Sequence, residues 1–358
     1  MARTRNRSRL TLPPSRAGLT EMLRGAGALP GGSVDQVEID LKIETSVSNL
    51  CFLTVRYSAD APALPAHLVV KWSPDGAKSN PADSLNPAIT REISFYANLA
   101  PSLPSPPVVR CVAFAPATEP TPWLVLEDLR GTHTNPPWPL PPSRENISHA
   151  VAALARIHAE WWESPTLGVS VGEPHTAESL ISMVSGIAGG LPGFLDALGD
   201  AVPSVTRAIL ERVFSSSLSP WLRLVDPRGL TVAHGDAHTW NFLFPRSGAG
   251  PTYLIDWQTW HLDIGARDLA FMMALHWYPE LRREVEEPLI KQYHCQLMEH
   301  GVTAYSFDDL WLDYRRCAIR NLTFPIILWS RGFRPEAWWH RLECAVAAFH
   351  DLHCEEVI

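Results

Sequence analysis

The sequence predicts an α+β protein with two lobes, an antiparallel β-sheet lobe followed by a mostly helical lobe. At 358 residues the chain exceeds the usual length of a single domain, so two lobes are expected. Strand-like patterns come before residue 130, and helical patterns dominate after it. We therefore expect a flexible basic tail at residues 1–30, a β-rich lobe at residues 31–129 and a helical lobe at residues 130–358.

The β-rich lobe begins with two strands that form a hairpin. Residues 34–44 alternate apolar and polar side chains, which is the period of a half-buried strand. The apolar members of this alternation are Val37, Ile39, Leu41 and Ile43. After five short or polar residues, β-branched and aromatic side chains dominate residues 50–58. Residues 67–72 and 123–129 are further predicted strands.

Helices are expected on both sides of the lobe boundary. One opens around residues 86–87, where Pro87 suits a first helical position, and runs to residue 99. Ser143 is a good N-cap for a helix that continues through Trp162. The rest of the chain reads as helical, apart from one central strand-loop-strand segment.

The composition excludes several classes of protein. Hydrophobic residues make up 46% and charged residues 19% of the chain, as in ordinary globular proteins. A net charge of −8 argues against a nucleic-acid partner, whose phosphates need Lys and Arg. The six cysteines form no C-x-x-C pair, so neither a zinc site nor a disulfide framework is indicated. We expect reduced thiols and a cytoplasmic location.

The first ten residues alternate Arg with small or polar residues, and no apolar segment of the signal-peptide type follows. A mitochondrial presequence is the alternative interpretation, because residues 1–20 contain no acidic residue. No apolar run approaches the length needed to span a bilayer, so no membrane span is expected.

The central segment, residues 231–257, carries the chemistry. Residues 234–241 read His-Gly-Asp-Ala-His-Thr-Trp-Asn, and Asp256 ends an apolar strand fifteen residues after Asn241. Phosphoryl transfer needs a carboxylate that accepts the proton of the attacking hydroxyl, a role that suits Asp236. It also needs hard oxygen ligands for Mg²⁺, and Asn241 and Asp256 supply them. The spacing matches the protein-kinase pattern H-x-D-x-x-x-x-N.

These motifs resemble those of the aminoglycoside phosphotransferase and choline-kinase-like superfamily, which has a protein-kinase-like bilobal fold. The segments at residues 263–270 and 154–159 are most similar to its ecdysteroid-kinase-like branch. The likeness implies an ATP-dependent kinase, with GTP as the alternative nucleotide, Mg²⁺ as cofactor and a small-molecule alcohol as acceptor.

The resemblance also implies roles for residues of the first lobe. Lys71 stands where the family's third-strand lysine holds the α- and β-phosphates, and Glu92, in the pattern Arg-Glu-x-x-Phe-Tyr, would be its partner on a helix. The segment where backbone groups meet adenine would be Glu127, Asp128 and Leu129.

One departure is the loop between the first two strands, which contains no glycine. Hydroxyl and backbone N–H groups of this loop are the alternative phosphate ligands. The residues concerned are Thr45, Ser46, Ser48 and Asn49.

Other polar residues near the motif have structural interpretations. His234 is expected to hold the loop by hydrogen bonding, and Asp268 to cap a helix or anchor the loop. His158 is expected to be a core histidine. For His238, packing beneath the loop and contact with substrate stay open. The tryptophans of the second lobe, Trp257 and Trp260 among them, could line an apolar substrate pocket or pack in the core.

Several alternatives remain beside the small-molecule kinase. A protein or lipid kinase is disfavoured by His-Gly-Asp in place of His-Arg-Asp. A nucleotide-binding pseudokinase would be favoured only if a catalytic residue were missing. A metal-dependent hydrolase would use His234, Asp236 and His238 as ligands. The acceptor is open between aminoglycosides and a more apolar alcohol such as a steroid or macrolide, which the tryptophans favour slightly.

Overall fold

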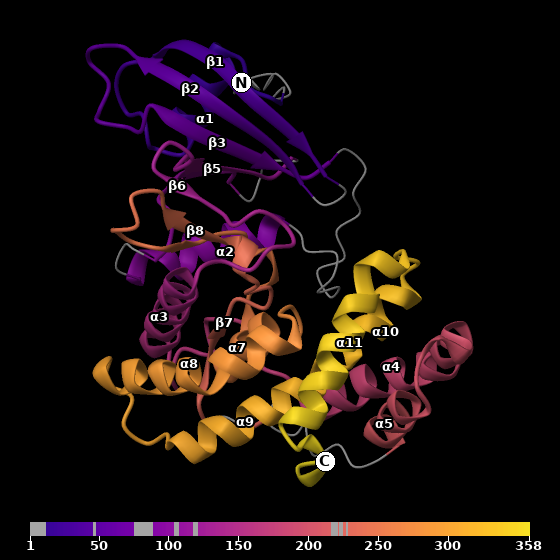
Figure 1. Cartoon of the computed structure of the whole chain (residues 1–358). Helices are drawn as coiled ribbons and strands as arrows, with labels where there is room; N and C mark the ends of the chain where they lie inside the picture. The colour runs from indigo at the N-terminus through magenta and orange to yellow at the C-terminus, as the bar shows by residue number, and fades with distance from the viewer. Residues whose placement is uncertain are drawn as a thin grey trace. The chain divides into compact units, whose positions relative to one another are not determined.

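The chain divides into two units in a computed structural model, and each unit is described by itself (Figure 1). The structure describes residues 12–45, 48–74, 89–103, 107–116, 121–215, 221, 225, 226 and 228–358. Unit 1 comprises Met1–Thr134, Pro245–Gly250 and Asp256–Thr259. Unit 2 comprises Asn135–Phe244, Pro251–Ile255 and Trp260–Ile358.

Unit 1 is built on a five-stranded antiparallel sheet, with the strands side by side in the order β1-β2-β3-β5-β4 (Figure 1). The strands are β1 (Val34–Glu44), β2 (Asn49–Tyr57), β3 (His67–Trp72), β4 (Cys111–Phe114) and β5 (Trp123–Glu127), and the short β6 (His133–Thr134) follows. Their β-branched and aromatic residues suit a pleated surface. The predicted hairpin of the first two strands and the predicted third strand are confirmed.

The alternation in β1 predicted the strand correctly and its burial wrongly. Ile39, Leu41 and Ile43 are exposed rather than half-buried. β1 is an edge strand of the sheet, and its register with β2 shifts between Ile39 and Leu41. An edge strand with such an irregularity lies beyond the packed face, which explains the exposure.

Helix α1 (Arg16–Gly25) corrects the prediction of a flexible tail over residues 1–30. Ser15 caps this helix by accepting a hydrogen bond from the Gly18 N–H at 3.2 Å. The side chains of Leu19, Met22 and Leu23 are buried in one core with residues of β1, β2, β3 and β5. Apolar side chains at i, i+3 and i+4 form one helix face, and this face outweighs the polar composition of the segment.

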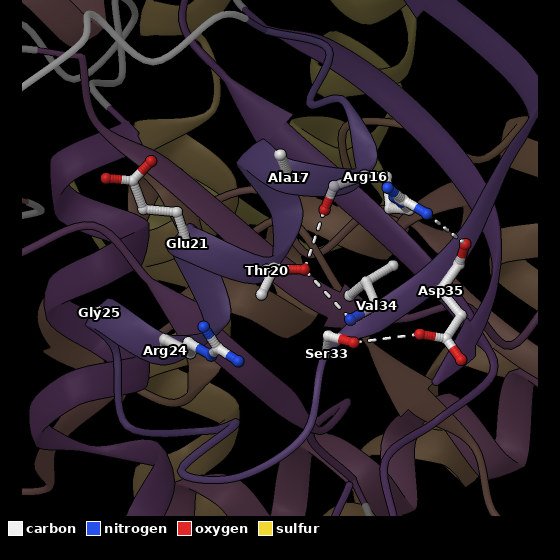
Figure 2. A pocket seen from close by; sticks show the side chains of 9 residues that line it. All are labelled: Arg16, Ala17, Thr20, Glu21, Arg24, Gly25, Ser33, Val34 and Asp35. Carbon is white, nitrogen blue, oxygen red and sulfur yellow. Dashed lines mark hydrogen bonds between the residues drawn. The ribbon is translucent and has the colours of Figure 1, made fainter. Parts of the chain in front are cut away.

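An open pocket lies against α1 at the start of β1 (Figure 2). Thr20 bridges the two elements, because its hydroxyl donates to the Arg16 carbonyl at 3.0 Å and accepts from the Val34 N–H at 3.1 Å. None of the predicted site residues lines this pocket. Its lining is Arg16, Ala17, Thr20, Glu21, Arg24, Gly25, Ser33, Val34 and Asp35.

Helix α2 (Ile89–Asn98), followed by η1 (Ala100–Ser102), packs against η4 (Trp257–Thr259) within unit 1. The rings of Phe95 and Trp257 stack with centroids 3.7 Å apart and planes at 6°. The helix start predicted at residues 86–87 lies outside the described residues.

The β-structure of unit 2 forms a ribbon and a hairpin. Strands β7 (Leu230–Ala233) and β10 (His261–Ile264) pair antiparallel. Strands β8 (Phe242–Pro245) and β9 (Tyr253–Leu254) form the hairpin, preceded by η3 (Thr239–Asn241). The central strand-loop-strand segment of the prediction is thus present, with β10 as the pairing partner of β7.

The remainder of unit 2 is helical, as predicted. Ser143 caps α3 by accepting a hydrogen bond from the Asn146 N–H at 3.2 Å, which confirms the predicted N-cap. In Figure 1, α3 runs beside α8 and α10 beside α11. The elements are α3 (Arg144–Glu160), α4 (Ala177–Leu198), η2 (Gly199–Ala201), α5 (Ser204–Ser215), α7 (Ala266–Met273), α8 (Pro279–Glu299), α9 (Phe307–Arg320), α10 (Thr323–Ser330), α11 (Pro335–Asp351) and η5 (Cys354–Glu356).

One segment of the described chain, Ala177–Ala201, is helical, long and apolar enough to cross a membrane by length and composition alone. This segment corrects the prediction that no apolar run of the sequence approaches the length needed to span a bilayer. Small and weakly polar residues such as Ser182 and Gly186 interrupt the apolar run without lowering its average much. One face of α4, including Leu191 and Phe194, is buried.

Candidate active site

The loop after β7 turns sharply at Gly235. This residue has φ +81°, in the left-handed region that glycine adopts without a steric penalty. The protein-kinase pattern carries Arg at this position, and the local backbone explains why the chain carries Gly. The turn directs the chain from the end of β7 into Asp236.

The buried carboxylate of Asp268 holds this turn through hydrogen bonds to its backbone. Asp268, in the first turn of α7, accepts hydrogen bonds from the N–H of His234 at 2.7 Å and of Gly235 at 2.9 Å. His158 Nε2 lies 3.2 Å from the same carboxylate. Burial raises the pKa of Asp268, but the hydrogen bond and charge of His158 and the His234 N–H outweigh it and lower the pKa. Asp268 is therefore an ionised anchor for the loop.

The two histidines of this network have both ring nitrogens occupied. His234 Nδ1 accepts from the Asp236 N–H at 3.2 Å, and its Nε2–H donates to the Ile255 carbonyl at 2.9 Å. His158 Nδ1 lies 2.8 Å from the Tyr293 hydroxyl. Both side chains hold structure, and the prediction that His158 is a core histidine is confirmed.

Asp236, Asn241 and His238 lie together on the loop, where Asn241 is buried and the other two are partly exposed. Asn241 Nδ2 donates to the Asp236 carbonyl at 2.9 Å and to its Oδ2 at 3.3 Å. His238 Nε2 lies 3.5 Å from the same Oδ2. These contacts orient the Asp236 carboxylate. Because its side chain is 35% exposed, the carboxylate is also accessible to an incoming molecule.

The β8-β9 hairpin sets the position of Asp256 along the chain. The Ile255 N–H donates to the Asn241 carbonyl at 2.9 Å, and Asp256 is the next residue. Asp256 has φ +68°, which is uncommon for a residue other than glycine, and strained backbone of this kind clusters at active sites.

Within unit 1, Lys71 is held by two carboxylates. Its Nζ lies 2.6 Å from Glu92 Oε2 and 2.7 Å from Asp256 Oδ1. The side chains of Lys71 and Glu92 are only 7% and 1% exposed, whereas that of Asp256 is 41% exposed. Asp256 is therefore the partner that faces solvent.

Electrostatics keep Lys71 charged inside unit 1. Burial alone lowers the pKa of Lys71, but the charges of Asp256 and Glu92 outweigh burial and raise it. Burial raises the pKa of Glu92, against the charge of Lys71 and a hydrogen bond from the Trp257 backbone. A permanent ammonium with one exposed partner suits the binding of a phosphate oxygen.

A family model of phosphotransferase enzymes matches residues 67–305, which is most of the chain and includes all of these residues. The chain belongs to the phosphotransferase enzyme family. The predicted relation to the aminoglycoside phosphotransferase and choline-kinase-like superfamily is thereby confirmed, while its closer branch stays a prediction. No curated protein sequence matches this phosphotransferase significantly.

Solved structures share the fold of the phosphotransferase at low sequence identity. A protein from Ralstonia eutropha JMP134 assigned to the aminoglycoside phosphotransferases has a TM-score of 0.57 at 13% identity, covering 94% of this chain and 97% of its own. A choline/ethanolamine kinase family protein from Mesorhizobium loti has a TM-score of 0.52 at 13% identity, covering 90% and 92%. The GDP complex of aminoglycoside 2'-phosphotransferase-IIIa has a TM-score of 0.54 at 15% identity, covering 95% and 99%.

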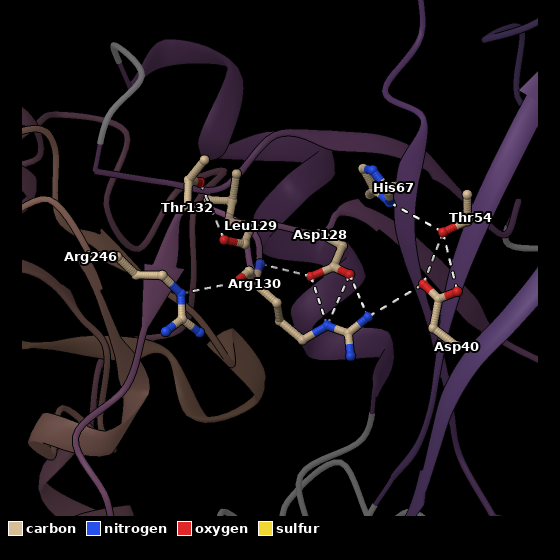
Figure 3. Close-up of polar contacts among 8 residues, drawn as sticks. All are labelled: Asp40, Thr54, His67, Asp128, Leu129, Arg130, Thr132 and Arg246. Carbon is tan, nitrogen blue, oxygen red and sulfur yellow. Dashed lines mark hydrogen bonds and ion pairs between the residues drawn. The ribbon is translucent and has the colours of Figure 1, made fainter.

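The segment predicted to meet adenine in the phosphotransferase begins at Glu127, the last residue of β5, and Figure 3 shows Asp128 and Leu129. The N–H groups of Glu127 and Asp128 donate to protein carbonyls, and the Leu129 carbonyl accepts from the His133 N–H at 2.8 Å. The Asp128 carboxylate is held by the Arg130 guanidinium at 2.8 to 3.1 Å. The side chain of Asp128 therefore orders the segment.

The glycine-free loop of the phosphotransferase is closed by Thr45 and Ser48. The Thr45 hydroxyl donates to the Ser48 carbonyl at 2.7 Å and accepts from the Ser48 N–H at 2.9 Å. Ser48 is buried, and Ser46 lies outside the described residues. The predicted phosphate contacts of this loop stay predictions.

The two tryptophans considered as substrate contacts are buried. Trp257 stacks on Phe95 and is fully buried, and Trp260 is nearly so. This burial fits a role in core packing better than direct contact of either side chain with a substrate.

The sequence interpretation missed four residues that surround His238. Trp240 and His276 have ring centroids 5.4 and 5.5 Å from His238, and Trp138 lies 4.2 Å from Trp240. The guanidinium of Arg341 contacts His276. They lie up to about two hundred positions apart in the chain and follow no motif, so only Trp240, inside the loop, offered a signal.

The hydrolase alternative finds little support in the geometry. Both ring nitrogens of His234 are occupied, one by the Asp236 N–H and the other by the Ile255 carbonyl. Among the described residues, no three His, Cys, Asp or Glu side chains are grouped so that they could hold a metal ion.

Proposed function

We propose that this phosphotransferase transfers the γ-phosphate of ATP to a hydroxyl of a small organic molecule, with Asp236 as the base. The observation that carries the proposal is the Asp236 carboxylate, which is partly exposed and oriented by Asn241. A carboxylate in this state can accept the proton of an attacking hydroxyl.

Lys71 supplies a fixed positive charge for the α- and β-phosphates in this proposal. Glu92 stays behind it as a buried partner, and Asp256, which is more exposed, can release its Lys71 contact when phosphate arrives. An ammonium held in place before nucleotide binds loses less entropy on binding.

The residues present also fit Mg²⁺. Asn241 uses Nδ2 in its bonds to Asp236, which leaves Oδ1 as an oxygen ligand, and Asp256 contributes a carboxylate whose side chain is 41% exposed. Carboxylate and amide oxygens are the ligands that Mg²⁺ prefers. When bound, Mg²⁺ would offset the negative charge of the β- and γ-phosphates. GTP stays the alternative nucleotide.

The fold neighbours support a small-molecule acceptor, since they include an aminoglycoside phosphotransferase and a choline/ethanolamine kinase family protein. A protein or lipid kinase and a non-catalytic nucleotide-binding protein are the competing proposals. A steroid- or macrolide-like alcohol stays a candidate acceptor.

The test is ATP consumption over a panel of aminoglycosides, macrolides, choline-like alcohols and sterols, with wild type, Asp236→Asn and Asp200→Asn. Asp236→Asn is expected to lower kcat about 100- to 10,000-fold, because a general base contributes that much. Asp200 is an exposed aspartate of η2, and its variant should match wild type. Turnover that survives in Asp236→Asn would remove the proposed mechanism.

A further inference from the structure

A group of aromatic and basic side chains lies beside Asp236 within unit 2. We call it the aromatic-basic cluster. Its ring centroids are 4.2 Å (Trp138–Trp240), 5.4 Å (His238–Trp240), 5.5 Å (His238–His276) and 6.0 Å (Trp240–His276) apart. Its members are Trp138, His238, Trp240, His276 and Arg341.

Arg341 is held in one orientation by neutral partners. Its Nε–H donates to His276 Nε2 at 3.3 Å, and its Nη1 donates to the Ala337 carbonyl. His276 Nδ1–H donates to the Phe271 carbonyl at 2.7 Å, which fixes the tautomer that accepts from Arg341. Burial, with the charge of Arg341 next, holds the pKa of His276 well below its usual range, so this ring stays neutral.

This arrangement leaves one edge of the guanidinium available. Arg341 Nη2 has no acceptor among the described residues, and Arg341 forms no ion pair with any of them within 4 Å. A guanidinium with a fixed free edge suits a carboxylate, because its planar donors match the two carboxylate oxygens.

Two further polar groups of the cluster lack partners. His238 Nδ1 and Trp240 Nε1 are buried and form no hydrogen bond with the described residues. Buried polar groups of this kind are normally satisfied by protein, water or ligand. An acceptor on a bound molecule would satisfy the Trp240 Nε1–H, and a donor such as a hydroxyl would satisfy His238 Nδ1, because His238 Nε2 faces the Asp236 carboxylate.

The charges of the cluster disfavour a cationic acceptor. Asp236 is the carboxylate that His238 meets, and its charge also acts on Arg341. The remaining members are a guanidinium, two imidazoles and two indoles. A polycation such as an aminoglycoside would place several ammonium groups near Arg341 with one carboxylate to balance them, and like charges disfavour binding.

We propose that the acceptor is a flat, largely apolar hydroxyl compound that carries a carboxylate, which binds Arg341 while the ring packs on Trp138 and Trp240. This inference rests on the proposed function and narrows its acceptor class. Indole faces bind flat apolar rings well, and the Trp138 ring is 61% exposed and so accessible to one.

The chemical step leaves the carboxylate of the acceptor unchanged. The acceptor hydroxyl gives its proton to the Asp236 carboxylate while its oxygen forms a bond to the γ-phosphorus of ATP. The bond from that phosphorus to the bridging oxygen breaks, and ADP leaves with the electron pair. The products are a phosphate ester and ADP.

Three matched alcohols test the proposal: para-hydroxymethyl benzoate, its methyl ester and para-hydroxymethyl benzylamine. They share the ring and the hydroxyl, and they differ in carrying a negative, a zero or a positive charge. We expect kcat/KM to fall in that order for wild type. In Arg341→Gln the preference for the carboxylate over the ester should fall about tenfold or more, as loss of a charge-assisted hydrogen bond implies.

Arg334→Gln is the matched control, because Arg334 is an exposed arginine at the start of the same helix, α11. This variant should keep the wild-type preference. If none of the alcohols is phosphorylated, titration of tryptophan fluorescence reports binding, since two indoles line the cluster.

Two outcomes would overturn the inference. One is a higher kcat/KM or tighter binding for the amine than for the carboxylate. The other is a carboxylate preference that Arg341→Gln leaves unchanged. The proposed function would survive either result if ATP consumption still depended on Asp236, and it would fail separately if no acceptor gave consumption dependent on Asp236.

Discussion

At the scale of single residues, Lys71 and Glu92 depend on one another. Burying a single charged side chain without a partner costs on the order of several kcal/mol. Their separation of 2.6 Å and the second carboxylate of Asp256 offset that cost. Removing one partner should therefore be far more damaging than removing both.

Lys71→Met should destabilise the protein in a pH-dependent way. The substitution removes the charge that lowers the pKa of Glu92, and burial already holds that pKa above its usual value of 4.5. With a raised folded-state pKa, the contribution of Glu92 to stability is present below about pH 4.5 and is lost as pH rises through the folded-state pKa. Urea unfolding should show a loss of about 3–5 kcal/mol at about pH 8 and less at about pH 5.5.

The double variant Lys71→Met/Glu92→Gln provides the control for this prediction. It carries no buried charge at either position, so the extra pH dependence should disappear. If the single variant showed the same loss at both pH values, Glu92 would not be the responsible group.

We expect Asp268 to affect the proposed reaction through the backbone that it holds. The Asp268 carboxylate accepts from the N–H groups of His234 and Gly235. In Asp268→Asn, one of these N–H groups would face the amide NH₂ of the new side chain and would lose its hydrogen bond. We expect a stability loss of about 1.5–3 kcal/mol, the range for hydrogen bonds to charged groups. Because Asp236 follows directly, kcat should fall while the KM for nucleotide changes little. Steady-state kinetics would contradict this positioning role if only KM changed.

At the scale of elements, the close approach of α3, α7 and α8 depends on Gly265, which precedes α7. A Cβ at this position would clash with the Tyr293 hydroxyl and lie 2.7 Å from His158 Nδ1. These same two side chains complete the network around Asp268. The glycine is thus required by packing, although its φ of −59° would suit any residue.

Gly265→Ala should therefore cost about 1–3 kcal/mol, the usual range for overpacking a core. Combining it with Tyr293→Phe removes the hydroxyl that the new methyl group meets. Thermal or urea unfolding should show that the double variant loses less than the sum of the two single variants. Simple additivity of the two losses would show that the clash is relieved elsewhere.

At the scale of the whole molecule, the predicted catalytic groups are distributed over both units. Lys71, Glu92 and Asp256 belong to unit 1, and Asp236 and Asn241 to unit 2. Each group is ordered within its own unit, by ion pairs in the first and by the Asp268 network in the second.

Nucleotide with Mg²⁺ should accordingly stabilise the whole protein. A ligand that binds only the folded state at about one hundred times its Kd adds about 2.7 kcal/mol. We expect Mg²⁺ to increase the thermal shift given by ADP in wild type and to add much less in Asp256→Asn. Thermal unfolding with ADP alone and with ADP and Mg²⁺ measures this difference. An equal effect of Mg²⁺ in both proteins would remove Asp256 from the proposed ligands.

The sequence by itself determined the family and most of the elements. Local signals predicted these elements, namely the alternation in β1, the apolar run of β3 and the Ser143 cap. Such signals lie within a few neighbouring residues, so they can be read without knowledge of the fold. The motif around Asp236 is also local, because its spacing follows from a single loop.

Tertiary structure decided what depends on contacts between distant segments. The burial of α1, the exposed outer face of β1 and the cluster around Arg341 each arise from packing partners far away in the chain. Burial and ionisation depend on the summed surroundings of a side chain, which a linear pattern does not encode. For this reason the sequence predicted the loop around Asp236 as a candidate site, whereas only the fold showed which side chains stand beside it.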